Sequence, residues 1–164
     1  MTGQIERRRR IGSDIQPDNT GRENDYKGTI YEYQVTQIQV SDAFRRRAFE
    51  LYENKCVLTE IEESPLVTLS HIVPRSDEIG YAEDITNVML LNWTHHVAFD
   101  SGIFTLDTDL RLRVNPAFKA NDSWLRRTLL ERDGKKLDLP EDVYLSEDRI
   151  RERNASIEWW PLSK

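Results

Sequence analysis

Cysteine is almost missing from this sequence of 164 residues, which contains only one, Cys56. A single cysteine excludes an internal disulfide and a zinc cluster built from several thiolates. Also missing is any apolar run of about 18 residues, the length that a membrane-spanning helix needs. The first residues lack the apolar centre of a secretory signal. We therefore expect a cytoplasmic protein, and its length suits a single domain.

Positive charge is also in short supply, since 23 lysines and arginines face 29 acidic residues and the net charge is −6. This balance argues against a protein that coats nucleic acid by charge alone, although a local basic patch is compatible with it. Histidine is scarce as well, and the three histidines are His71, His95 and His96. All three lie within residues 69–100. Histidine-dependent chemistry, if present, is therefore confined to that stretch.

The stretch begins with a predicted strand that ends near a histidine. Residues 66–72 are apolar and β-branched, and Pro74 should end the strand because it cannot donate to a ladder. His71 can then project into a cleft, where an imidazole with a pKa near 6.5 suits the general base of a hydrolysis. The plainer alternative for His71 is a hydrogen-bonded structural residue, and Asn87 by itself is typical of a turn.

A short helix is predicted between Asn92, a good N-cap, and Gly102, a good C-terminal stop. His96 and Asp100 are four residues apart, so they share a helix face and could hold one divalent ion. His95 lies about 100° around the helix from His96, so we do not expect both histidines to bind that ion. The alternative is a surface pair worth a few tenths of a kcal/mol.

Three ordered motifs resemble those of the HNH endonuclease family, in its subgroup related to restriction enzymes. Residues 56–59 (CVLT) resemble the opening C-x-x-T-G, and residues 70–74 (SHIVP) resemble A-H-I-x-P. Residues 87–91 (NVMLL) and 96–102 (HVAFDSG) resemble N-G-L-x-L and H-x-x-F-D-x-G. The motif core covers residues 56–106, with a weaker likeness over about 44–140.

The resemblance implies a ββα-metal core and metal-dependent hydrolysis of DNA phosphodiesters, with restriction or defence among the roles left open. It implies that His71 is the general base, that Asn87 orients it through hydrogen bonds, and that His96 binds the metal. Asp100 stands where some relatives have a further ligand. Mg²⁺ is the expected ion because oxygen ligands and waters would dominate, while Mn²⁺, Ni²⁺ or Zn²⁺ could replace it.

Two positions depart from the family pattern. Ser70 stands where many relatives have a metal-binding aspartate or histidine, and Glu60 stands where the family usually has glycine. Ser70 leaves a second hypothesis open, a nucleic-acid-binding module that has lost catalysis and holds a structural metal or none. The sequence also leaves RNA open in place of DNA.

The rest of the chain predicts an α+β fold around this core. Residues 1–25 are polar and basic and predict a disordered tail, and residues 26–164 form the predicted domain. A strand is predicted over residues 29–40, and a hairpin over 103–114. Caps and apolar spacing predict helices over residues 42–53, from 121 or 122 to 132, and over 146–156.

Three arginines are candidate contacts to DNA phosphates. Arg45 and Arg46 lie on the first predicted helix, and Arg75 lies in the loop after His71. The planar guanidinium group suits phosphate oxygens. The common alternative is that these side chains are simply solvated.

Overall fold

The structure, a computed structural model, describes residues 40–74 and 79–161. The predicted tail, the predicted strand up to residue 39 and Arg75 lie outside the described residues. The helices are α1 (Asp42–Leu51), α2 (Trp93–Asp100), α3 (Ser123–Thr128) and α4 (Glu147–Ala155). The strands are β1 (Val67–His71), β2 (Val88–Asn92), β3 (Phe104–Leu106) and β4 (Leu112–Val114). Within the described residues, no helix combines the length and apolar character that crossing a membrane requires.

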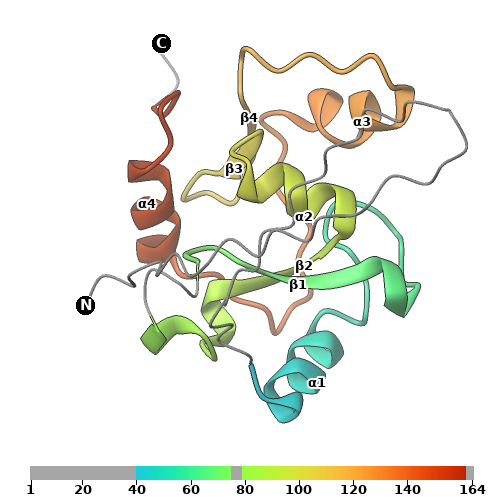
Figure 1. Ribbon diagram of the computed structural model, residues 1–164, viewed down its shortest axis with the longest axis vertical. Helices are drawn as coiled ribbons and strands as arrows, with labels where there is room; N and C mark the ends of the chain where they lie inside the picture. Colours follow the sequence, from blue (N-terminus) through green and yellow to red (C-terminus); the bar gives the residue numbers. More distant parts are fainter. Residues whose placement is uncertain (1–39, 75–78, 162–164) are drawn as a thin grey trace, which may run out of the picture. The chain divides into compact units, whose positions relative to one another are not determined.

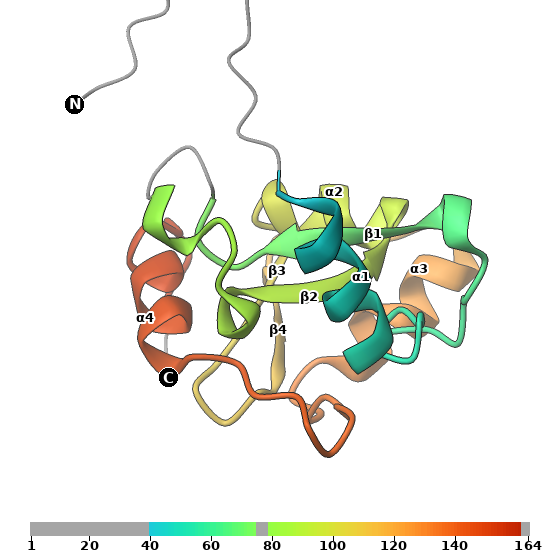
Figure 2. The ribbon, with the colours of Figure 1, turned by 90° about the horizontal axis from the view of Figure 1, so that it is seen from below.

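The strands β1 and β2 form an antiparallel pair at the centre of the described fold. The register joins Val67 to Asn92 at one end and His71 to Val88 at the other. Helices α1 and α2 pack on opposite faces of this pair (Figures 1 and 2). Every residue of β2 is consequently buried, which explains its continuous apolar sequence. The strand predicted to end near His71 is confirmed.

Helix α1 begins where the sequence offers a cap and is tied to β2 at its end. The Ser41 hydroxyl accepts a hydrogen bond from the Phe44 amide at 3.2 Å. Ala48 is buried, and the hydroxyl of the buried Tyr52 donates to the Val88 carbonyl at 2.7 Å. This bond satisfies the polar end of a tyrosine whose ring fills the core. Burial raises the pKa of Tyr52 above its ordinary value.

The predicted short helix after β2 is confirmed as α2. The side-chain oxygen of Asn92 accepts from the His95 amide at 3.0 Å, as an N-cap does. The chain leaves the helix at Ser101 and turns at Gly102, whose φ of 67° lies in the left-handed region that glycine tolerates best. Asn92 and Gly102 thus set the two ends of the helix.

The predicted hairpin is confirmed by the antiparallel strands β3 and β4, but the predicted helix from 121 or 122 to 132 was wrong in its second half. Helix α3 ends at Thr128, and a separate 3₁₀ turn covers Leu130–Arg132. The Thr128 hydroxyl donates to the Trp124 carbonyl at 2.9 Å, a bond that bends helices. Leu129 leaves helical geometry (φ −120°, ψ −68°) and becomes fully buried.

The predicted last helix is confirmed as α4, which stands beside one end of the β1–β2 pair in Figure 1. Ser146 caps the helix by accepting from the Arg149 amide at 3.4 Å. Near its other end, the side-chain Nδ2 of Asn154 donates to the Leu106 carbonyl at 2.8 Å, and its Oδ1 accepts from the Thr105 hydroxyl at 2.6 Å. These buried bonds hold α4 against β3.

Candidate active site

His71 is the last residue of β1, and its ring is held by the loop that follows. The residue is 8% exposed, and its Nε2 lies 2.9 Å from the carbonyl oxygen of Ala82. Because a carbonyl oxygen only accepts, this hydrogen bond requires hydrogen on Nε2. In the neutral ring the lone pair is then on Nδ1.

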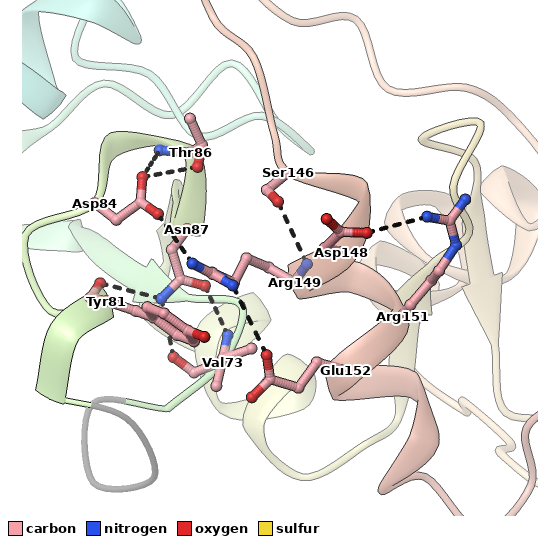
Figure 3. Close-up of polar contacts among 10 residues, drawn as sticks. All are labelled: Val73, Tyr81, Asp84, Thr86, Asn87, Ser146, Asp148, Arg149, Arg151 and Glu152. Atoms are coloured by element: carbon pink, nitrogen blue, oxygen red, sulfur yellow. Dashed lines mark hydrogen bonds and ion pairs between the residues drawn. The ribbon is translucent and has the colours of Figure 1, made fainter.

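Asn87, immediately before β2, closes the loop that holds His71. Its side chain is fully buried, and its Oδ1 accepts from the Val73 amide at 2.9 Å. Its Nδ2 donates to the carbonyls of Val73 at 3.1 Å and Tyr81 at 3.2 Å (Figure 3). One amide group therefore joins the chain just after His71 to the residue before Ala82.

His96 and Asp100 lie one turn apart on α2. The Nε2 atom of His96 is 3.3 Å from Oδ2 of Asp100, and the two side chains are 20% and 57% exposed. The Nδ1 atom of His96 is buried and has no hydrogen-bond partner among the described residues. The exposed ring of Trp93 stacks on the imidazole, with centroids 6.1 Å apart.

The separation of this pair suits two ligands of one ion. Two atoms bonded at about 2.1 Å to one cation lie about 3.0 Å apart in octahedral and about 3.4 Å apart in tetrahedral geometry. The 3.3 Å between His96 and Asp100 falls between these values. Within the described residues, no group of three or more metal-binding side chains gathers at this pair or at any other place. Waters and a substrate phosphate would therefore complete the coordination, as they commonly do for Mg²⁺.

Ser70, the residue before His71, is fully buried. Its hydroxyl has no hydrogen-bond partner within residues 40–74 and 79–161. An unpaired buried hydroxyl costs about 1–3 kcal/mol of folding free energy. The position that departs from the family pattern thus carries a polar atom that a small ligand or water could satisfy.

His95, the sequence neighbour of His96, has a different environment. It is fully buried, with Nδ1 2.8 Å from Nδ2 of Asn92 and Nε2 2.9 Å from the Thr128 hydroxyl. Its ring stacks on Trp124 with centroids 4.8 Å apart. Burial lowers the pKa of His95 to about 4, and the positive charge of Arg132 adds to the effect. His95 is therefore neutral at pH 7 and joins α2 to α3.

Arg153 on α4 is a residue of this region that the sequence interpretation missed. It is 8% exposed, and its Nη1 donates to the Ile72 carbonyl at 3.2 Å while Nη2 donates to the Phe99 carbonyl. Its guanidinium carbon lies 3.5 Å from the centre of the Phe99 ring. Burial lowers the pKa of Arg153 to about 10, against the opposing effect of Asp100. An arginine in a highly charged helix gives no sequence signal of burial.

A cavity of about 390 Å³ adjoins the metal-ligand candidate on the side of α4. Its lining includes Pro74, Asp100 and Trp159, and the Trp159 indole donates to the Gly102 carbonyl at 2.7 Å. The loop after β1 and the end of α2 therefore meet at one hollow. Asp100 has room beside it for a ligand of modest size.

The arginines predicted to contact DNA are not gathered with these side chains. Arg45 and Arg46 are exposed on α1, which lies across the β1–β2 pair from α2 (Figure 2). Arg75 lies outside the described residues.

Comparison with known proteins relates part of the chain to a family. Residues 56–107 match the model of the HNH endonuclease family. Among solved structures, the chain is similar to a modification dependent TagI restriction endonuclease, with a TM-score of 0.52 and 18% identity. That likeness covers 69% of this chain and 36% of the other, and at such low identity it shows the fold alone. No curated protein matches the chain. Residues 56–107 therefore match the HNH endonuclease family, as their motifs indicated, and the fold around them is α+β.

Proposed function

We propose that this protein hydrolyses DNA phosphodiester bonds, with His71 as the general base and one divalent ion held by His96 and Asp100. The observation that carries the proposal is the arrangement inside the HNH segment. A strand end presents an imidazole with an assigned basic nitrogen, and a helix packed on that strand presents a histidine–aspartate pair at ligand spacing. A role in restriction enters the proposal through the motif resemblance, since the structural likeness shows the fold alone.

His71 supplies the base. With Nε2 donating to the Ala82 carbonyl, Nδ1 accepts the proton of the attacking water. Asn87 keeps the loop closed through its three side-chain hydrogen bonds and so holds the ring in place. General-base catalysis of this kind contributes about 10²- to 10⁴-fold to the rate.

The pair on α2 supplies the metal ligands. A divalent ion bound there, with Mg²⁺ the expected one, would offset negative charge on the phosphate and the leaving oxygen. Nε2 of His96 must be unprotonated and Asp100 ionised for the pair to bind a cation. The exposed face of Trp93, beside His96, offers a surface on which a nucleobase can stack.

Basic side chains would bind the duplex on either side of the scissile phosphate. Arg75, four residues after His71 in the sequence, is the nearest candidate along the chain. Arg45 and Arg46 on α1 would contact phosphates farther along, because α1 and α2 lie on opposite faces of the strand pair.

Plasmid cleavage with Mg²⁺ or Mn²⁺, with and without EDTA, tests the proposal. We expect His71→Ala to lower the rate at least about 100-fold while its melting temperature stays near that of the wild type. Thr94→Ala, which alters an exposed side chain of α2, should cleave like the wild type. Equal inactivity of wild type and His71→Ala in every metal would contradict the proposal.

The second candidate function is a nucleic-acid-binding module without catalysis. Ser70 favours it, because this position carries a metal ligand in many relatives. In that case the wild type and His71→Ala both bind DNA in a gel-shift assay, and neither cuts it. If an ion were purely structural, His96→Ala would lower the melting temperature by several degrees, whereas loss of a catalytic ion leaves folding nearly intact.

A further inference from the structure

Helix α4 lies outside the family segment 56–107, yet it contacts both halves of the candidate site. Through Arg153 it reaches Ile72, which follows His71, and Phe99, which precedes Asp100. Both contacts are hydrogen bonds to backbone carbonyls, so they position the chain itself. One buried guanidinium group therefore joins the strand end that carries the base to the helix end that carries the metal ligand.

The chemistry of arginine suits this role. The guanidinium is planar, and its N–H groups point in fixed directions, so two acceptors are held at a set separation. The Phe99 carbonyl belongs to the last turn of α2, where a positive charge interacts favourably with the helix dipole. A lysine keeps the charge but is a single flexible donor group. Replacement by lysine should therefore preserve the attraction between the positive charge and the end of α2. It should not hold the Ile72 and Phe99 carbonyls at a set separation.

A second arginine of α4 supports the loop that holds the His71 ring. The guanidinium carbon of Arg149 lies 3.2 Å from the centre of the Tyr81 ring, and Nη2 is 3.7 Å from Asp84 (Figure 3). Ala82, whose carbonyl binds His71, lies between those two residues. The N-cap residue of α4 adds a bond of 2.9 Å from the Ser146 backbone amide to the Thr86 carbonyl. The helix thus braces the base from two directions.

We propose that Arg153 is a positioning residue of the nuclease site, which sets the distance between the His71 ring and the ion held on α2. The inference rests on the function proposed above. Arg153 acts through the two backbone carbonyls and touches no reacting atom. A misplacement of about 1 Å in such a site can lower the rate about 100-fold.

The test compares Arg153→Lys with Arg151→Lys. Arg151 lies on the same helix, is exposed, and pairs with Glu147 and Asp148 on that helix. Mn²⁺ serves as the probe, because its unpaired electrons broaden nearby imidazole NMR signals with a steep dependence on distance. The chain has only three histidines to assign. Melting temperature, kcat and KM are measured on the same samples.

We expect Mn²⁺ to broaden the His96 signal by the same amount in the wild type and in Arg151→Lys. The same should hold for the His71 signal. In Arg153→Lys the His96 signal should broaden as before, while the broadening of His71 should change. The kcat of Arg153→Lys should fall about 10- to 100-fold with KM nearly unchanged. Unchanged His71 broadening in Arg153→Lys would overturn the proposal, and so would the absence of Mn²⁺ broadening in the wild type.

The NMR and kinetic results separate the two proposals. If wild type cuts no DNA but His71 broadening changes in Arg153→Lys, the positioning role stands and the nuclease function fails. Arg153→Met, which carries no buried charge, gives the same comparison if the lysine variant does not fold. Failure of both variants to fold would overturn the proposal, since Arg153 would then be a requirement of the fold itself.

Discussion

At the scale of single residues, hydrogen bonds decide what each histidine can do. His71 donates from Nε2 to a carbonyl, so its neutral ring carries the lone pair on Nδ1. His96 has Nε2 beside a carboxylate, where an ion can bind. His95 uses both nitrogens for buried contacts with Asn92 and Thr128. Adjacent residues of the same type therefore differ in role because a helix points them in different directions.

His95 should make the stability of the protein depend on pH. Its pKa is lowered to about 4 in the folded state, against 6.5 in the unfolded chain. Between these values the unfolded chain binds more protons, so the free energy of unfolding falls as the pH drops from about 6.5 to about 4. The shift corresponds to about 3 kcal/mol at most. Urea unfolding monitored by circular dichroism at pH 7, 6, 5 and 4 measures it.

His95→Gln is the matched variant, because glutamine is polar and does not titrate. We expect this variant to be less stable at pH 7 but to lose less stability between pH 6.5 and 4 than the wild type. Carboxylates titrate in both proteins, so the difference between the two pH profiles isolates His95. Parallel profiles would contradict the assignment.

Asn87→Asp should damage both the fold and the proposed activity. Aspartate keeps the acceptor for the Val73 amide but cannot donate to the carbonyls of Val73 and Tyr81. A buried carboxylate beside two unpaired carbonyls should lower the free energy of unfolding by about 3 kcal/mol. Urea unfolding measures the loss, and plasmid cleavage should fall with it. Asn115→Asp is the control, since Asn115 accepts from the Ala117 amide, a bond that aspartate retains. Equal stability of the two variants would argue against the role of Asn87.

At the scale of elements, local signals predicted most helices and failed where tertiary packing decides. Ser41, Asn92 and Ser146 cap their helices through their own side chains, so the starts of α1, α2 and α4 can be predicted from sequence. The break after Thr128 follows from a side-chain bond and from the burial of Leu129 in a core assembled from distant segments. No local pattern contains that information.

The candidate site likewise has a part that could be predicted from the sequence and a part that could not. Motif spacing indicated His71, Asn87, His96 and Asp100, because the family arranges them along one short stretch. The contribution of α4 could not be predicted, since its sequence is that of a charged surface helix. Only the packed structure shows that Arg153 is buried against two carbonyls.

Arg149→Gln should loosen the loop that holds the base. The variant removes the contact with the Tyr81 ring and the ion pair with Asp84. We expect a loss of about 1 kcal/mol, given the partial exposure of the pair. Local opening would then become about fivefold more frequent. Hydrogen exchange at the Thr86 and Asn87 amides measures the opening, and the exposed Arg151→Gln should leave it unchanged. Equal exchange rates in the two variants would show that Arg149 does not brace the loop.

At the scale of the whole molecule, the hydrophobic core extends beyond the family segment. Both faces of β2 are covered, and one cover is α1, which precedes residue 56. Fully buried side chains also come from segments after residue 107; they include Leu112, Leu129, Leu145 and Ile150. The HNH segment supplies the candidate chemistry, whereas the flanking helices complete the core that holds it in shape.

The isolated segment 56–107 should therefore fail to fold, while residues 40–161 should fold. Without α1 the segment loses Ala48 and Tyr52, and one face of the apolar strand β2 meets water. A two-stranded pair with a single helix, in about 50 residues, buries too little apolar surface to offset its conformational entropy. Circular dichroism with urea titration should show no cooperative transition for 56–107 and a single one for 40–161. A cooperative transition in the shorter fragment would contradict this expectation, because its own side chains would then suffice for the fold.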